Sequence, residues 1–292
     1  MSEAPFAVAS IEPVVLEGPP GFAAWGPMSP YVWPLANGRF AMLLRAVPPD
    51  ASITGLIWYA EGDGLRFAAD PASLLAPGPD PIDLAGCEDP TVAWIEGECI
   101  VYYTGLRPDG VAQLLCARGP DVRAIRKCGV AHASTASDRN TKEATLERLQ
   151  RQWLLLFEYS RDGRSRVGKA NGPTPLGPWQ EQADPFLARP DAWDCHHLST
   201  GPLVLDASRD PVMFYNGSDG AANWAIGWIE LDQTCSHAIA RSAEPLIVPG
   251  GDPAADGRLI AFANSAVCRG SRIWLYFTHN DCVLYRATIE RR

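Results

Sequence analysis

Residues 96–103, Glu-Gly-Glu-Cys-Ile-Val-Tyr-Tyr, join a turn of small and polar residues to a short run of aliphatic and aromatic residues. The same combination occurs five times, and the ends of successive runs lie 59, 54, 58 and 61 residues apart. Five units of this length nearly fill the 292 residues, so the chain is organised as a repeat. The runs end at Leu44, Tyr103, Phe157, Tyr215 and Tyr276.

Each run has a strand candidate on either side, short, rich in β-branched and aromatic residues, and bounded by Gly, Pro, Asp or Ser. Repeats of several strands are typical of a β-propeller, because one blade cannot bury both of its faces alone. We therefore predict an all-β chain, a single five-bladed β-propeller over residues 1–292, in which even the helix-like stretch 141–151 forms a strand and hairpin. The candidates before the runs are residues 31–33, 91–94, 144–146, 203–205 and 266–268, and those after the runs are 55–59, 112–117, 166–170, 224–229 and 283–289.

The composition restricts the class of protein and of ligand. With 47% hydrophobic and 20% charged residues the chain can bury an ordinary core, which excludes a disordered protein. A net charge of −9 attracts neither a nucleic-acid backbone nor an anionic membrane, so we expect a neutral or weakly charged ligand. Residues 1–13 lack the pattern of a signal peptide, and no apolar stretch approaches a membrane span. We expect a soluble, cytoplasmic protein, and the sequence leaves a homo-oligomer open.

The cysteines and histidines give no pattern typical of a metal site. Eight cysteines are scattered without a Cys-x-x-Cys pair, and several lie inside apolar runs, which favours buried core thiols over disulfides or zinc. His196 and His197 follow Asp194 and Cys195, but adjacent side chains of a strand face opposite ways, so both histidines cannot easily bind one ion. We predict no metal and no cofactor, and take His197 as a candidate donor to a sugar.

Two carboxylates occupy the same place in neighbouring repeats: Asp89 and Glu143 each lie 14 residues before the end of their run. The innermost strands of a propeller line a central funnel, so equivalent positions of successive blades face one cavity. The residues that follow the runs add further polar groups there, among them Arg45, Glu158 and Asn216. Two acids in one funnel suit cleavage of a glycosidic bond, in which one acid protonates the leaving oxygen and another group activates the nucleophile.

Several segments resemble glycoside hydrolase family 130, the β-mannoside phosphorylases and β-mannosidases. Residues 87–92, Cys-Glu-Asp-Pro-Thr-Val, followed by Gly97 and by Tyr-Tyr-Thr at 102–104, are similar to the Glu-Asp-Pro-Arg motif of that family and its Tyr-Thr strand. Residues 172–179 also resemble family 43 arabinofuranosidases and xylosidases, which share the five-bladed fold. Further family 130 matches occur in the order of the family, at 43–46 with 63–67, 142–146, 199–202 with 214–217 and 240–246, and 264–267 through Asp281.

The resemblance implies roles for individual residues. Asp89 matches the general acid of the family. Tyr103 belongs to the matched Tyr-Thr strand, His197 is the candidate sugar donor, and Asn216 stands where the phosphorylases have His. We take all three as candidate substrate-binding residues. By the resemblance, Arg45, Asp63, Lys142, Glu143 and Asp281 would contact the sugar.

Departures from the family pattern bear on the reaction. Thr91 stands where the family commonly has Arg, and Glu158-Tyr159 stands where the phosphorylases have His-Arg. Phosphate requires cationic donors, and a carboxylate at 158 would repel it. We therefore expect inverting hydrolysis of a β-mannoside-like oligosaccharide, with Asp89 as the acid and Glu158 as the base. Glu143 is the alternative base. An inverting enzyme keeps its two carboxyl groups about 6.5–9.5 Å apart.

Three other interpretations stay open at this point. The first is a phosphorylase that uses inorganic phosphate. The second is a family 43-like arabinofuranosidase or xylosidase. The third is a propeller that binds a glycan without cleaving it.

Overall fold

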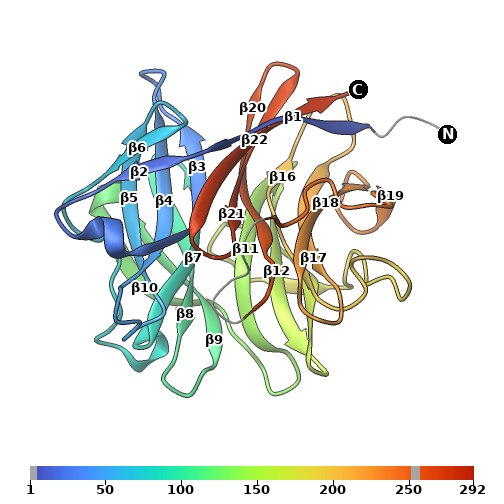
Figure 1. Ribbon diagram of the computed structural model, residues 1–292. Coiled ribbons are helices and arrows are strands. Elements are labelled where there is room, and N and C mark those ends of the chain that lie inside the picture. The colour runs from blue at the N-terminus through green and yellow to red at the C-terminus, as the bar shows by residue number, and fades with distance from the viewer. Residues whose placement is uncertain (1–4, 251–256) are drawn as a thin grey trace.

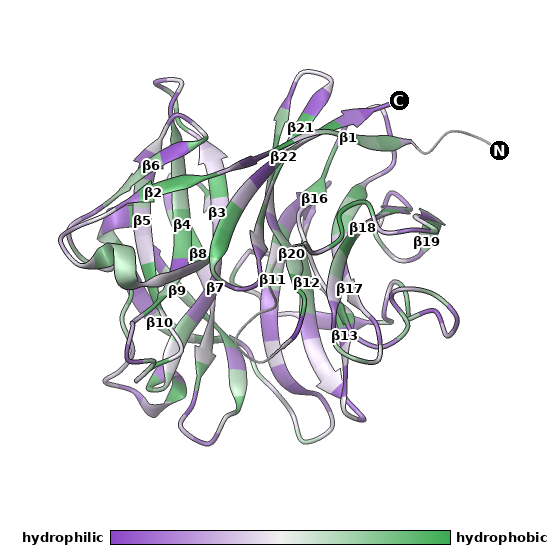
Figure 2. Cartoon of the chain, viewed as in Figure 1, coloured by the Kyte–Doolittle hydropathy of each residue, from purple (hydrophilic) through white to green (hydrophobic). Residues whose placement is uncertain are grey.

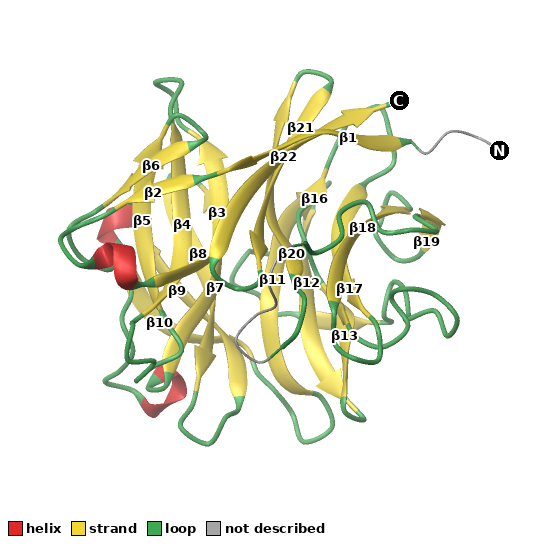
Figure 3. Ribbon diagram, viewed as in Figure 1, coloured by secondary structure: helices red, strands yellow, loops and turns green. Residues whose placement is uncertain are grey.

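The strand repeat folds into a ring of sheets. The computed structural model describes residues 5–250 and 257–292. Five sheets stand around a common centre as the blades of a β-propeller (Figure 1). Nearly everything in the described part is strand or loop, and the helices are short turns at the periphery (Figure 3). The predicted all-β, five-bladed fold is confirmed.

Each blade is a meander that runs outward from an inner strand, and in blades 1 and 5 a strand from the start of the described chain adds the outer edge. The pairing is antiparallel except between β2 and β6. Blade 1 contains β3 (Gly26–Pro34), β4 (Phe40–Val47), β5 (Leu56–Gly62), β6 (Arg66–Ala69) and β2 (Val15–Glu17); blade 2 contains β7 (Gly86–Ile95), β8 (Glu98–Leu106), β9 (Ala112–Gly119) and β10 (Arg126–His132); blade 3 contains β11 (Arg139–Leu149), β12 (Gln152–Arg161), β13 (Arg164–Gly172) and β14 (Gln180–Gln182). Blade 4 contains β15 (Leu198–Ser199), β16 (Leu203–Val204), β17 (Val212–Ser218), β18 (Trp224–Leu231) and β19 (Ala238–Arg241); blade 5 contains β20 (Ala261–Arg269), β21 (Arg272–His279), β22 (Val283–Arg291) and β1 (Phe6–Pro13).

All fifteen strand candidates of the sequence overlap observed strands, and the stretch 141–151 lies in β11 and its hairpin turn. Seven strands were not predicted: β1, β2, β6, β10, β14, β15 and β19. Three 3-10 turns complete the described elements: η1 (Phe22–Ala24), η2 (Pro81–Asp83) and η3 (Val122–Ala124). No described helix is long and apolar enough to cross a membrane.

The ring is closed by its first strand. β1 pairs antiparallel with β22, so the two ends of the described chain share blade 5 (Figure 1). The backbone N–H of Arg292 donates to the carbonyl oxygen of Pro5 at 2.9 Å and extends that pairing. Blade 5 therefore has four strands, of which only β20, β21 and β22 are consecutive in the sequence.

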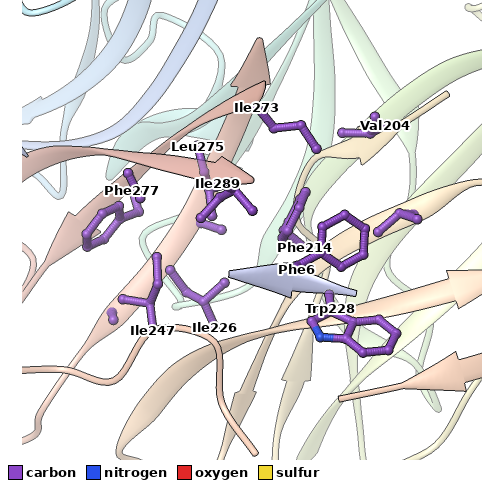
Figure 4. Packing of buried hydrophobic residues seen from close by; sticks show 14 residues of the cluster. Phe6, Val204, Phe214, Ile226, Trp228, Ile247, Ile273, Leu275, Phe277 and Ile289 are labelled. Carbon is purple, nitrogen blue, oxygen red and sulfur yellow. The ribbon is translucent and has the colours of Figure 1, made fainter. Parts of the chain in front are cut away.

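The hydrophobic core is divided among the five junctions between blades. Each of five clusters draws its buried side chains from two adjacent blades. At the junction of blades 4 and 5, Phe6 of β1 packs against Phe214 and Trp228, with ring centroids 5.5 Å apart in both pairs (Figure 4). Along the strands hydrophobic and hydrophilic residues intermix (Figure 2). Stacking of the blades fixes how the inner strands face one another.

The cysteines divide between core and surface. All eight are free thiols. The expectation of buried core thiols holds for four of them and is wrong for three, because those three lie at turns or on edge strands that the blade junctions do not cover. The buried ones are Cys87, Cys99, Cys116 and Cys235; Cys128, Cys268 and Cys282 are exposed, and Cys195 is half-buried.

Candidate active site

A cavity of about 300 Å³ opens at the centre of the ring, where the inner strands begin. Its wall carries five carboxylates and three cationic side chains, a density of charge that buried surfaces rarely hold without a function. Two larger hollows, of about 360 and 490 Å³, lie away from the centre between blades 2 and 3 and between blades 4 and 5. The charged residues of the central cavity are Arg45, Glu88, Asp89, Lys142, Glu143, Glu158, Arg258 and Asp281.

A β-bulge at the same place in three blades aims side chains at this cavity. The strand ladders shift register after Met28 in β3, after Glu88 in β7 and after Lys142 in β11. The next residues, Ser29, Asp89 and Glu143, all have left-handed backbones, with φ of 52°, 48° and 52°. Non-glycine residues adopt this conformation rarely, and bulges of this kind redirect side chains near active sites. The predicted convergence of Asp89 and Glu143 therefore has a backbone cause.

Asp89 is held from two sides. The Ser29 hydroxyl donates to Asp89 Oδ1 at 2.6 Å, and Arg45 Nη1 lies 3.7 Å from the same oxygen. Arg45 is itself fixed, because its Nη2 lies 3.0 Å from Glu88 Oε1 and its Nε donates to the carbonyl oxygen of Thr54 at 2.8 Å. Asp89 thus stands in a fixed frame of donors at the cavity wall.

Glu143 carries the most perturbed titration of the cavity. Burial and the charge of Asp89 hold the pKa of Glu143 well above its ordinary value, although Lys142 opposes them. The two carboxyl groups also hydrogen-bond to each other. Burial raises the pKa of Glu88 as well, against the effect of Arg45. Burial and a nearby like charge both favour the protonated form of a carboxyl group.

Glu158 lies across the strand pair from Lys142 and is only 2% exposed. Lys142 Nζ lies 3.4 Å from Glu158 Oε1, and the Ser165 hydroxyl donates to that same oxygen at 2.7 Å. The Glu158 carboxylate raises the pKa of Lys142 against the effect of burial. A charged group therefore faces the cavity from blade 3 beside the Asp89–Glu143 pair.

Blades 4 and 5 supply a wall that is mostly uncharged. Trp224, Phe262, Asn264 and Thr278 line the cavity, together with the charged Asp281 and Arg258. Ser29 and Trp224 are absent from the residues assigned from the sequence. Ser29 could have been found, because it lies 15 residues before Leu44, one more than the spacing that identified Asp89 and Glu143.

Three residues that the sequence assigned to substrate lie elsewhere, and their positions correct that assignment. Asp63 is exposed in the turn between β5 and β6, where its Oδ1 accepts from the backbone N–H groups of Leu65 and Arg66 at 2.9 and 2.8 Å. Tyr103 is buried and donates its hydroxyl to Asp83 at 3.0 Å. Both are used for local structure.

Asn216 is fully buried between blades 4 and 5. Its side-chain oxygen accepts from the N–H of Ala263 at 2.7 Å, and its Nδ2 donates to the carbonyl oxygens of Thr200 and Ala263 at 2.6 and 3.1 Å. Both polar atoms of the Asn216 side chain are therefore hydrogen-bonded to backbone groups. Asn216 therefore ties two blades together and does not reach the cavity.

His197 lies against the wall rather than in it. Its ring stacks on Trp224, with centroids 5.8 Å apart and planes inclined by 14°. Its Nδ1 accepts from the backbone N–H of Ser165 at 3.0 Å. Burial lowers the pKa of His197, and the adjacent His196 adds to the effect. Among residues 5–250 and 257–292, no group of three or more His, Cys, Asp or Glu side chains is arranged so that it could hold a metal ion.

The chain is similar to proteins that act on mannosides. It is 22% identical over 269 residues to a 1,2-beta-oligomannan phosphorylase of Thermoanaerobacter sp. (strain X514), a match that covers 88% of this chain and 87% of the relative. No protein-family model matches it. The structure of a beta-1,2-mannobiose phosphorylase from Listeria innocua with beta-1,2-mannobiose superposes with a TM-score of 0.77 at 16% identity, covering 97% of this chain and 91% of that one.

A second solved structure carries the family name. It superposes with a TM-score of 0.76 at 20% identity and covers 90% of this chain and 84% of that one. It is described with the statement that the GH130 family of mannoside phosphorylases contains glycoside hydrolases that target beta-1,2 mannosidic linkages in Candida mannan. The resemblance of this chain to glycoside hydrolase family 130, first visible in its ordered motifs, is thereby confirmed, together with the five-bladed propeller.

Proposed function

We propose that this protein is an enzyme that cleaves a β-mannosidic linkage in an oligosaccharide. The observation that carries the proposal is the meeting of the Asp89–Glu143 pair with Glu158 around one central cavity. The names of the similar proteins support the bond and the sugar, because they act on 1,2-β-oligomannan and β-1,2-mannobiose. A neutral oligosaccharide also suits a chain with a net charge of −9.

The Asp89–Glu143 pair acts as the general acid. The raised pKa of Glu143 favours the protonated form of that carboxyl group, and its proton is available to the leaving oxygen. Arg45 and the Ser29 hydroxyl keep Asp89 in place beside it. Since the two carboxyl groups interact directly, the role belongs to the pair rather than to either residue alone.

Glu158 acts as the general base, and water is the acceptor. Phosphate would have to enter a cavity with five carboxylates and three cations. Two of those cations, Arg45 and Lys142, are already in ion pairs with Glu88 and Glu158. Placing another anion there costs electrostatic free energy that a neutral water does not incur. Hydrolysis with inversion is therefore the form of cleavage that the charges of the cavity favour.

Phosphorolysis is the second candidate function. It is favoured by the names of the curated relative and of the Listeria structure, both of which are phosphorylases. In that case Lys142 would exchange Glu158 for phosphate, and the sugar would leave as its 1-phosphate. The two candidates differ in the acceptor and not in the bond that breaks.

The test is to incubate the purified chain with β-1,2-mannobiose, with and without inorganic phosphate, and to identify the products. Hydrolysis predicts free mannose at a rate that phosphate does not raise. Mannose 1-phosphate formed only with phosphate would establish phosphorolysis instead. Aryl arabinofuranosides and xylosides serve as controls for the family 43-like specificity, and binding of the disaccharide without either product would identify a glycan-binding propeller.

A further inference from the structure

The hairpin between β12 and β13 places a serine against the proposed base. Asp162 and Gly163 at its tip have φ of 54° and 72°, the conformation of a tight two-residue hairpin turn. The strands then pair in regular register, with Ser160 opposite Ser165. Ser165 therefore stands at a fixed position on β13, close to Glu158 on the neighbouring strand.

Both donors to the Glu158 carboxylate reach one oxygen. Ser165 Oγ donates to Oε1 at 2.7 Å, and Lys142 Nζ lies 3.4 Å from the same atom. In the described part of the chain this leaves Oε2 as the oxygen that can accept a proton. Two donors on one oxygen also fix the rotation of the carboxylate, which a single ion pair would leave free.

A histidine holds Ser165 in turn. His197 Nδ1 accepts the backbone N–H of Ser165 at 3.0 Å, and the His197 ring stacks on Trp224 of the cavity wall. An imidazole accepts at Nδ1 only when that nitrogen carries no proton. Burial lowers the pKa of His197 and so favours this neutral form. The contacts form one path from the aromatic wall to the carboxylate.

We infer that Ser165 is a positioning residue that orients Glu158, so that Oε2 takes the proton from the attacking water. The inference rests on the proposed function, because it needs Glu158 to be a base. Glu158 is buried, so a donor lost from it is not readily replaced by bulk water. The hydroxyl of residue 165 also favours the ionised carboxylate, which is the form a base requires.

Other charged groups face Glu158, and the test must leave them in place. Lys142 and Glu143 interact with it from β11, and His197 does so from the segment just before β15. A change confined to Ser165 removes none of these charges. The remaining charged groups of the cavity are Arg45, Glu88, Asp89, Arg258 and Asp281.

The experiment compares the pH profiles of hydrolysis by the wild-type chain and by Ser165→Ala, Ser165→Thr and Ser165→Cys. Loss of the hydroxyl removes a donor from the ionised carboxylate and should move the acidic limb of kcat/KM upward by about one pH unit. It should also lower kcat about 10-fold with little change in KM. The Ser165→Thr variant keeps a hydroxyl, so its acidic limb should lie at the wild-type pH. The Ser165→Cys variant has a weaker donor, so its limb should lie between those of Ser165→Ala and the wild type.

Ser208→Ala is the matched control. It removes a hydroxyl that donates to Asp206 at 2.8 Å on an exposed turn, and its profile should coincide with that of the wild type. If the acidic limb of kcat/KM does not move in Ser165→Ala, the inference about Ser165 is overturned, while the proposed hydrolysis by the wild type is unaffected. Release of mannose 1-phosphate in place of mannose by the wild type would overturn the proposed function, and the role of Ser165 with it.

Discussion

Blades 2 and 3 and blades 4 and 5 use the same positions of the repeat for different purposes. Just after the residue where pairing breaks, blades 2 and 3 carry Asp89 and Glu143, whereas blades 4 and 5 carry Thr200 and Asn264. The acids face each other in the cavity. The Thr200 hydroxyl instead donates to the carbonyl oxygen of Glu143 at 2.7 Å.

The partner strands repeat the contrast. Blade 3 places Glu158 opposite Lys142. Blade 4 places Asn216 opposite Ser199, and the Asn216 amide hydrogen-bonds to the backbone of Thr200 in its own blade and of Ala263 in blade 5. A repeat fold therefore supplies equivalent positions around one centre. The side chain at each position decides whether it holds a charge for chemistry or a hydrogen bond for the ring.

The largest effect on activity should come from removing the carboxyl groups of blades 2 and 3. Asp89→Asn and Glu143→Gln each remove one carboxyl group of the interacting pair and should lower kcat by about 10²- to 10⁴-fold. The double variant should lose little more than either single one, because the two groups act as a unit. The measurement is mannose release under saturating disaccharide, with circular dichroism to verify the fold.

Asp206→Asn makes the same chemical change on an exposed turn and serves as the control for these variants. Wild-type turnover by Asp89→Asn would remove Asp89 from the chemistry. The contrast between the two halves of the ring would then lose its functional meaning.

The uncharged side should respond in stability rather than in activity. Asn216→Ala leaves the N–H and carbonyl of Ala263 and the carbonyl of Thr200 unpaired in a buried place, which should cost about 2–4 kcal/mol. Thermal unfolding should show a lower Tm, while KM of the folded enzyme stays the same. Asn37→Ala, which removes a bond in an exposed turn, is the matched control. A raised KM with an unchanged Tm would return Asn216 to the substrate.

The pH dependence of stability should report the buried acids. Glu143 and Glu88 have pKa values raised above those of the unfolded chain. At pH values between the unfolded pKa and the raised folded pKa, the folded state therefore binds more protons than the unfolded state. Stability should therefore fall as pH rises through the raised values. Glu143→Gln should flatten this fall, measured by denaturant unfolding between pH 5 and 9. A slope that does not change in the variant would mean that Glu143 ionises without cost.

The smallest effect is expected at Asp63. Its carboxylate caps a turn on the surface of blade 1, so Asp63→Ala should cost less than about 1 kcal/mol and leave kcat/KM within about twofold. Steady-state kinetics with β-1,2-mannobiose make the check. A KM raised tenfold would show instead that the turn reaches the substrate.

The inner part of each blade could be predicted from sequence because burial leaves a pattern there. The runs ending at Leu44 and Tyr103 are buried on both sides, and the runs repeat at nearly constant spacing. Strand β14, Gln180–Gln182, is exposed at every residue and has no such pattern. The pairing of β1 with β22 joins residues nearly a chain length apart, which local sequence does not encode.

The site residues could be predicted from sequence only where their position within the repeat determines where they lie. Asp89 and Glu143 follow from a shared spacing, and the structure brings them together. The destinations of Tyr103 and Asn216 depend on Asp83 and on the backbone of Ala263, partners that the motif resemblance does not specify. Ser165 carries no motif at all, since only the hairpin brings it beside Glu158.

The closure of blade 5 by β1 has a consequence for how the protein is made. During synthesis β22 is made long after β1, and until then β1 lacks the strand with which it pairs. Residues 6–13 therefore precede their partner strand by some 270 residues of translation. An unpaired strand edge is a site for self-association. Trimming of residues 6–13 by a protease would leave the β22 edge open in every molecule, and aggregation would report that loss.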